Sequence, residues 1–382
     1  MTKVEESLGL ISVARGTGKA DLYIGGGNLV NVLSGEIYPA NVAVWNGRIA
    51  YVGLSRKMAG SNTRVIDTGG YYLCPGLIEA HFHPWFVYNP VSIMEVALAS
   101  GTTTMLCDNL ILYINLGAER FLKILKALDN YPLRLLWTAR VMSHSPYPGE
   151  EEFFSIENLR KVFFDPHILK VGEFTQWRKL IEGDNNLVEG LDNFSPHFVF
   201  SRGELAAVDG KLTKSINERE GYLERQDDLL YCTLIDRCSK WITNGFVSGL
   251  GQFEALATTL SSSLNLFVVG QDFSAMARAA SKVVEMGGGI ALIEKGEISY
   301  SFPLKLAGVM STQSFAEAAA KIQEFDEKAS ALGYKYNDIC YTLLFLACDF
   351  LPFLRITGLG IINIKNKRTI IPSRKIKINP GE

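Results

Sequence analysis

Two histidines at the end of an apolar run are the residues of this sequence best suited to chemistry. His81 and His83 close the stretch that begins at Cys74, and the apolar residues of this stretch predict a β-strand. Side chains along a strand repeat every two residues, so both imidazoles point to the same face. There they can hold one metal ion through neutral imidazole nitrogens. The alternative is a pair of histidines that form only local hydrogen bonds.

Alternating strands and helices must position this pair. The expected strands span residues 73–78, 102–106, 133–142 and 168–171. The expected helices lie near residues 92–100 and 118–128. Strands that alternate with helices predict a parallel sheet or barrel.

Composition shifts divide the rest of the chain. Short alternating strands between residues 20 and 53 indicate a small β unit, whereas residues 181–230 are charged and weakly periodic. Beyond them, strands are expected at residues 245–250, 264–269 and 290–294, and helices at 275–286 and 314–332. Ser314 and Glu317 have the spacing of a capping box. We therefore expect an α/β protein with a β unit over 1–71, a central domain over 72–195 and a C-terminal α/β domain over 196–382.

Composition and charge narrow the classes of partner. Apolar residues make up 47% of the 382 residues, and 38 Lys and Arg balance 40 Asp and Glu. No basic excess is present to neutralise a phosphate backbone, so nucleic acid is excluded as a partner. No run reaches the ~20 apolar residues of a membrane span. The six cysteines show no CxxC pairing and the amino terminus lacks a signal peptide, which together favour the cytoplasm.

The surroundings of the histidine pair resemble a known superfamily. Residues 75–83, followed by Gly101 and three threonines, resemble the amidohydrolases, in which the first strand of a metal-dependent TIM-like barrel ends in such a pair. Residues 169–173, 242–249 and 283–290 are similar to adenine deaminases. The likeness covers residues 10 to about 180 and about 198 to 375.

The resemblance implies a set of metal ligands. Besides His81 and His83, Glu173 would bridge two divalent ions, of manganese, iron or zinc, from the fourth strand. Lys170 competes for this role, because some relatives use a carboxylated lysine there. Strand parity places Lys170 and Glu173 on opposite faces, and the likeness to adenine deaminases favours Glu173.

The resemblance also implies a reaction. Adenine would be deaminated hydrolytically to hypoxanthine and ammonia through a metal-activated water. Trp85 and Asp108 lie near strand ends and are expected to contact this purine base. A hydrolase of another cyclic amide or amidine is the alternative on the same scaffold. A homo-oligomer is also expected.

The chain departs from the family in the length of its barrel. A closed barrel takes about 250 residues, yet roughly 120 residues separate Cys74 from Phe194, where the likeness has already ended. Four strands fit and eight do not, so we expect an incomplete barrel. The resemblance implies further ligands from later strands, namely two histidines and an aspartate. His144 could reach a pocket at the carboxyl end of the barrel but is expected to be a polar loop residue. His167 is expected on the opposite, stabilising face and His197 in the irregular segment, so none of them matches these further ligands. A non-catalytic remnant that acts only in assembly or binding is therefore the other hypothesis.

Overall fold

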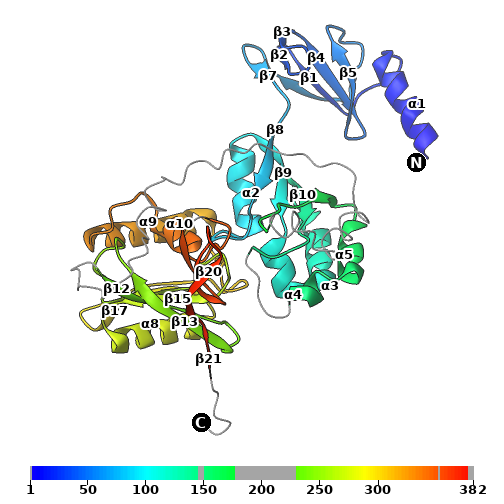
Figure 1. Ribbon diagram of the computed structural model, residues 1–382. Coiled ribbons are helices and arrows are strands. Elements are labelled where there is room, and N and C mark those ends of the chain that lie inside the picture. Colours follow the sequence, from blue (N-terminus) through cyan, green and yellow to red (C-terminus); the bar gives the residue numbers. More distant parts are fainter. Residues whose placement is uncertain (1, 145–149, 177–228, 352, 377–382) are drawn as a thin grey trace. The chain divides into compact units, whose positions relative to one another are not determined.

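The computed structural model describes residues 2–144, 150–176, 229–351 and 353–376 (Figure 1). The chain divides into two compact units, Met1–Leu77 and Ile78–Glu382. Helices and strands occur together, so the fold is α/β as predicted. The predicted boundary near residue 195 lies outside the described residues, and the three-domain division stays a prediction.

Two small sheets and one helix make up the first unit. Its strands are β1 (Leu22–Gly25), β2 (Asn28–Asn31), β3 (Glu36–Pro39), β4 (Asn41–Trp45), β5 (Arg48–Gly53), β6 (Arg64–Asp67) and β7 (Tyr72–Leu73). They form a four-stranded sheet with order β5-β4-β1-β6 and a three-stranded sheet with order β3-β2-β7. Helix α1 (Lys3–Ala14) begins with a capping box between Thr2 and Glu5. The strands predicted between residues 20 and 53 are confirmed.

The run predicted as one strand over 73–78 is divided between two strands, so that prediction was wrong in extent. β7 pairs in parallel with β2 in the first unit. β8 (Leu77–Phe82) begins after a break and pairs with β9 in a different sheet. The break contains Pro75, which has no N–H to donate to a strand ladder. The sequence pattern concealed this break because the flanking residues are apolar throughout.

A four-stranded sheet at the start of the second unit carries the histidine pair. Its strands, in the order β11-β10-β9-β8, are β11 (Ile168–Val171), β10 (Arg134–Ala139), β9 (Thr102–Asp108) and β8. β10 pairs in parallel with both β9 and β11. The intervening helices are α2 (Pro90–Ala99), α3 (Leu110–Leu128), α4 (Glu150–Phe153) and α5 (Ile156–Phe163). The predicted alternation is confirmed, and the described strands of this sheet number half of an eight-stranded barrel.

Helix α3 is longer than the helix predicted near residues 118–128. Its first two turns bury Leu110, Ile111 and Tyr113, and Asn115 is the one strongly polar residue of this segment. A helix without a polar face leaves no 3.6-residue pattern to detect, which explains the shortfall. Gly117 kinks the helix with a φ of 71°, a conformation that glycine adopts without steric cost. Among the described residues, no helix is long and apolar enough to cross a membrane.

Both outer strands of the four-stranded sheet are open. β8 and β11 form its two edges, and neither has a second neighbouring strand within the described residues. Ile78 on β8 is 69% exposed, and Leu169 on β11 is 60% exposed. Exposed apolar edge strands offer unpaired backbone groups to further strands. Within the described residues, this sheet therefore resembles a fragment of a barrel with two unpaired edge strands.

The last part of the second unit is built on a seven-stranded sheet with order β17-β16-β14-β15-β12-β13-β21. Its strands are β12 (Leu230–Ile235), β13 (Trp241–Val247), β14 (Ala255–Thr258), β15 (Leu266–Gly270), β16 (Gly289–Glu294), β17 (Glu297–Pro303) and β21 (Arg374–Lys375). Three more strands, β18 (Leu354–Thr357), β19 (Gly360–Asn363) and β20 (Arg368–Pro372), form a separate sheet. The helices are α8 (Phe273–Glu285), α9 (Phe315–Ala331) and α10 (Ile339–Leu346).

Side chains of the seven-stranded sheet alternate between two hydrophobic clusters. Ala255 and Ala257 pack with Val268 and with helix α8 in one cluster. Leu256 and Val269 point the other way, into the larger cluster that includes residues of α9 and α10. This period of two is the expected pattern for a sheet covered on both faces. The predicted capping box is confirmed, since Ser314 and Glu317 cap the start of α9 reciprocally.

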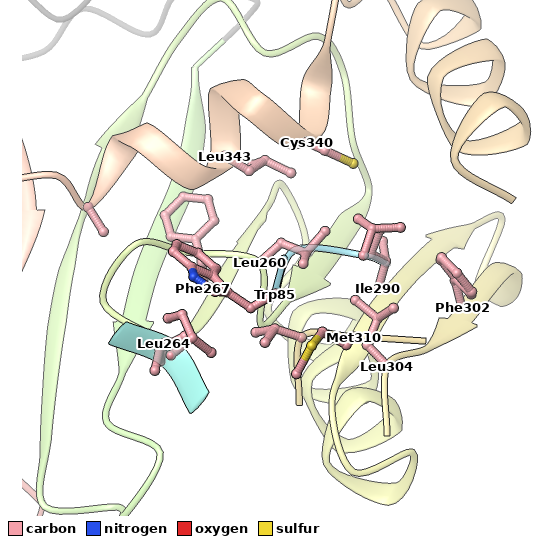
Figure 2. Packing of buried hydrophobic residues seen from close by; sticks show 14 of the residues in the cluster. Trp85, Leu260, Leu264, Phe267, Ile290, Phe302, Leu304, Met310, Cys340 and Leu343 are labelled. Atoms are coloured by element: carbon pink, nitrogen blue, oxygen red, sulfur yellow. The ribbon is translucent and has the colours of Figure 1, made fainter. Parts of the chain in front are cut away.

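One hydrophobic core joins the barrel fragment to the seven-stranded sheet. Trp85 and Phe121 belong to the same buried cluster as Phe267 and Met310, and Figure 2 shows Trp85 together with Phe267 and Met310. Val87 also forms an isolated parallel bridge with Met310. The described residues of the two domains predicted at 72–195 and 196–382 therefore share one core.

Candidate metal centre

The two histidines meet at the carboxyl end of β8. His81 is on the strand and His83 follows directly after it, so both rings project to the same side. Their ring centroids are 4.9 Å apart, and the two Nε2 atoms are separated by 3.0 Å. The same-face arrangement predicted from the two-residue spacing is confirmed.

Glu173 completes a cluster with the histidine pair. It follows β11, so it lies at the same end of the sheet as the histidines although it is far from them in sequence. One ligand atom from each of His81, His83 and Glu173 lies within 4.8 Å of the other two. The structure thus brings together the three residues proposed as metal ligands, whereas their binding of a metal stays a prediction.

Arg140 is a buried cation beside this cluster that the sequence analysis missed. It follows β10, and its side chain has no solvent exposure. Its Nε donates to Asp108 Oδ2 at 2.5 Å, and its Nη2 donates to Glu173 Oε2 at 2.5 Å. Nη1 donates to the backbone oxygen of Glu173 at 2.9 Å. The available signal was weak, because Arg140 is one of two arginines in the otherwise mostly apolar stretch 133–142.

Asp108 lies at the end of β9 and is 4% exposed. Its Oδ1 accepts from the backbone N–H of Leu110 at 2.9 Å and lies 4.0 Å from His83 Nδ1. Burial by itself raises the pKa of the Asp108 carboxyl, but the charges of Arg140 and of nearby histidines outweigh it and bring the pKa to about 2. Asp108 is therefore an anion at neutral pH, and its contact with a substrate stays a prediction.

His144 lies in the loop after β10, as expected, and its side chain is buried. Its ring stacks on Phe350 with a centroid distance of 5.6 Å and meets the edge of Trp85 at 6.3 Å. Its Nε2 lies 3.4 Å from Nη2 of Arg140. Burial, together with the Arg140 charge, lowers the pKa of His144 well below its ordinary value. Aromatic partners distant in sequence exclude water here, which a local reading of the loop could not reveal.

Trp85 is part of the core beside the cluster. It is 5% exposed, and its Nε1 donates to the backbone oxygen of Asp108 at 3.2 Å. Its ring meets the ring of His83 edge to face, with centroids 4.9 Å apart. Trp85 thus packs directly against His83, one of the proposed metal ligands. Its contact with a purine stays a prediction.

The remaining candidates lie elsewhere. His167 pairs with Asp165 and Asp129 before the start of β11, so its predicted place at the opposite end of the sheet is confirmed. Lys170 is exposed on β11. His197 lies outside the described residues.

The donor set suits a divalent cation. Two imidazole nitrogens on one tetrahedral zinc ion are about 3.3 Å apart, close to the 3.0 Å between the Nε2 atoms of His81 and His83. Burial lowers the pKa of His83, which favours the neutral imidazole that binds metals. His83 Nδ1 is buried with no hydrogen-bond partner among the described residues, and Asp108 Oδ1 is the nearby carboxylate able to orient the ring.

Comparison with solved structures finds metal-dependent hydrolases. One is an N-acyl-D-glutamate deacylase from Bordetella bronchiseptica in complex with zinc, which is 18% identical. The match covers 38% of this chain and 36% of that chain with a TM-score of 0.28.

Sequence comparisons identify a narrower group. Residues 207–368 match the adenine deaminase C-terminal domain. An adenine deaminase of Moorella thermoacetica is 35% identical over 182 residues, which cover 46% of this chain and 30% of the relative. A protein of Picrophilus torridus, named provisionally as an adenine deaminase, is 19% identical over 549 positions that cover 97% of this chain and 95% of the relative. Over most of its length this chain is therefore similar to adenine deaminases.

The long alignment also bears on the incomplete barrel. It runs over 549 positions, while this chain has 382 residues, so at least 167 positions are occupied by the relative alone. The incomplete barrel expected from the sequence agrees with this difference in length.

Proposed function

We propose that this chain binds a divalent metal ion through His81, His83 and Glu173 and carries out hydrolytic deamination of adenine. Adenine and water would give hypoxanthine and ammonia. The observation that carries the proposal is the convergence of these three side chains at one end of the parallel sheet, in a chain that is similar to adenine deaminases. A bound divalent ion supplies a water of lowered pKa as the nucleophile.

The residues around the cluster have distinct tasks in this proposal. Arg140 holds the Glu173 side chain in place through two hydrogen bonds, one to Oε2 and one to the backbone oxygen. Asp108 orients His83 and, as an anion with a pKa of about 2, accepts hydrogen bonds at neutral pH instead of donating a proton. Burial and the Arg140 charge lower the pKa of His144 and keep its ring neutral, so it adds no further positive charge beside the cluster.

The rate of the isolated chain is expected to be low. In the family the remaining ligands and the general acid come from later strands of the barrel, and no residue of this sequence was matched to them. Reacting groups must be aimed within a fraction of an ångström for efficient catalysis. Turnover of adenine should therefore fall far below the ~10 per second that is typical of enzymes.

The test is ammonia release from adenine in the presence of Mn²⁺, Fe²⁺ or Zn²⁺. The wild-type chain is compared with His81→Ala and Glu173→Gln, and His167→Gln is the matched control because this histidine lies outside the cluster. We expect slow release that both cluster variants abolish and the control retains. Release that is equal in all four proteins would refute the proposed site.

We also propose self-association, because the two edges of the four-stranded sheet are open. Four parallel strands are half of an eight-stranded barrel, so a second copy of this chain could supply the missing half by pairing β8 with β11 of its partner. The exposed Ile78 and Leu169 would be covered in that arrangement. Light scattering after size-exclusion chromatography should give at least the mass of a dimer. A monomer at micromolar concentration would exclude this second proposal.

A further inference from the structure

We propose that the Arg140 guanidinium takes the position of a second cation, so that this site binds one divalent metal ion and not two. The inference rests on the proposed metal site at His81, His83 and Glu173. It departs from the bridging role between two ions that the family resemblance implied for Glu173.

The argument begins with the oxygens of Glu173. A carboxylate that bridges two metal ions uses one oxygen for each ion. Glu173 Oε2 accepts a charge-assisted hydrogen bond from Arg140 Nη2. One oxygen of Glu173 therefore remains for a metal ion held together with His81 and His83.

Both carboxylate oxygens of Asp108 also accept hydrogen bonds already. Its Oδ2 accepts from Arg140 Nε at 2.5 Å, and its Oδ1 accepts from the backbone N–H of Leu110. The second carboxylate near the cluster is thus already neutralised by the same guanidinium. Among the described residues, the three-residue cluster is the set of side chains with metal-binding geometry in this region.

The position of Arg140 also opposes a second ion by its charge. Its side chain is fully buried, so little water screens the repulsion between the guanidinium and an ion next to Glu173. Arginine stays protonated at all accessible pH values, which makes this positive charge permanent. The guanidinium and one divalent ion already carry three positive charges against the two negative charges of Asp108 and Glu173, so a second divalent ion would add to an existing excess of positive charge.

Metal stoichiometry tests the inference. Equilibrium dialysis of the purified full-length chain with Mn²⁺ should give one tightly held equivalent, with the electron paramagnetic resonance signal of an isolated ion. Arg140→Met should free Glu173 Oε2 and both oxygens of Asp108 from the guanidinium and raise the bound Mn²⁺ toward two equivalents. Arg140→Lys keeps the charge and should stay at one equivalent.

The outcomes separate this inference from the proposed function. Two equivalents in the wild-type chain, both lost in His81→Ala, would overturn the inference and leave the proposed metal site intact. No bound Mn²⁺ in the wild-type chain would overturn both. Arg140→Met leaves the carboxylates of Asp108 and Glu173 without their guanidinium partner, and this variant can fail to fold. The wild-type stoichiometry and the Arg140→Lys variant decide the question in that case, because two equivalents in Arg140→Lys would also overturn it.

Discussion

Replacing Trp85 by alanine is expected to destabilise the second unit strongly, because this side chain joins the barrel fragment to the rest of its core. Trp85 is 5% exposed and belongs to the same cluster as Phe267 and Met310 from the later part of the chain. Its Nε1 also donates to the backbone oxygen of Asp108 at 3.2 Å. Alanine would remove both the packing and the hydrogen bond.

The size of the effect follows from the buried area. An aromatic side chain buries about 150–250 Å², which at about 25 cal/mol per Å² corresponds to roughly 4–6 kcal/mol for complete burial. Substitutions of buried aromatic residues by alanine cost about 3–5 kcal/mol. The unpaired oxygen of Asp108 adds about 1 kcal/mol. Trp85→Phe retains most of the ring area and should cost only about 1–2 kcal/mol, mainly from the lost hydrogen bond.

Urea unfolding followed by circular dichroism measures the free energy of unfolding for the three proteins. Phe164→Ala is the matched control, since this aromatic ring is 81% exposed and its loss should change stability by less than about 0.5 kcal/mol. Equal stabilities of Trp85→Ala and Trp85→Phe would refute the packing argument. A Trp85→Ala protein of normal stability that loses only affinity for adenine would instead support the substrate contact predicted from the sequence.

Three further predictions concern stability. Burial acts to lower the pKa of His167, but hydrogen bonds to Asp165 and Asp129 outweigh it and raise the pKa. The protonated ring therefore stabilises the fold fully below pH ~6.5, and this stabilisation is lost as the pH rises through the folded-state pKa. His167→Gln should therefore cost more at pH 5.5 than at pH 9, by up to about 1 kcal/mol in urea unfolding, and equal costs would contradict this. Ser314→Ala should lower stability by about 1 kcal/mol through loss of the α9 cap; an unchanged midpoint would show that the cap is dispensable. Asp108→Asn leaves the Arg140 guanidinium without its buried partner and should cost about 3–5 kcal/mol in the same assay, whereas a loss under about 1 kcal/mol would argue against a buried ion pair.

The features that sequence determined by itself are local ones. The two-residue spacing of His81 and His83 is enough to place both rings on one face of a strand, because side-chain direction in a strand depends only on position along it. The capping box of Ser314 and Glu317 is likewise complete within four residues. Glu173 was predicted as a ligand only from the family resemblance, because residue spacing alone does not link it to the histidines.

Tertiary structure decided everything that depends on contacts between distant segments. Arg140 reads as an ordinary charged residue until β9, β10 and β11 align their ends and bring Asp108 and Glu173 to either side of it. His144 reads as a loop residue until Phe350 covers it. Burial is a property of the folded chain and not of a local pattern, so the charge balance of the site and the pKa of its groups follow from the fold.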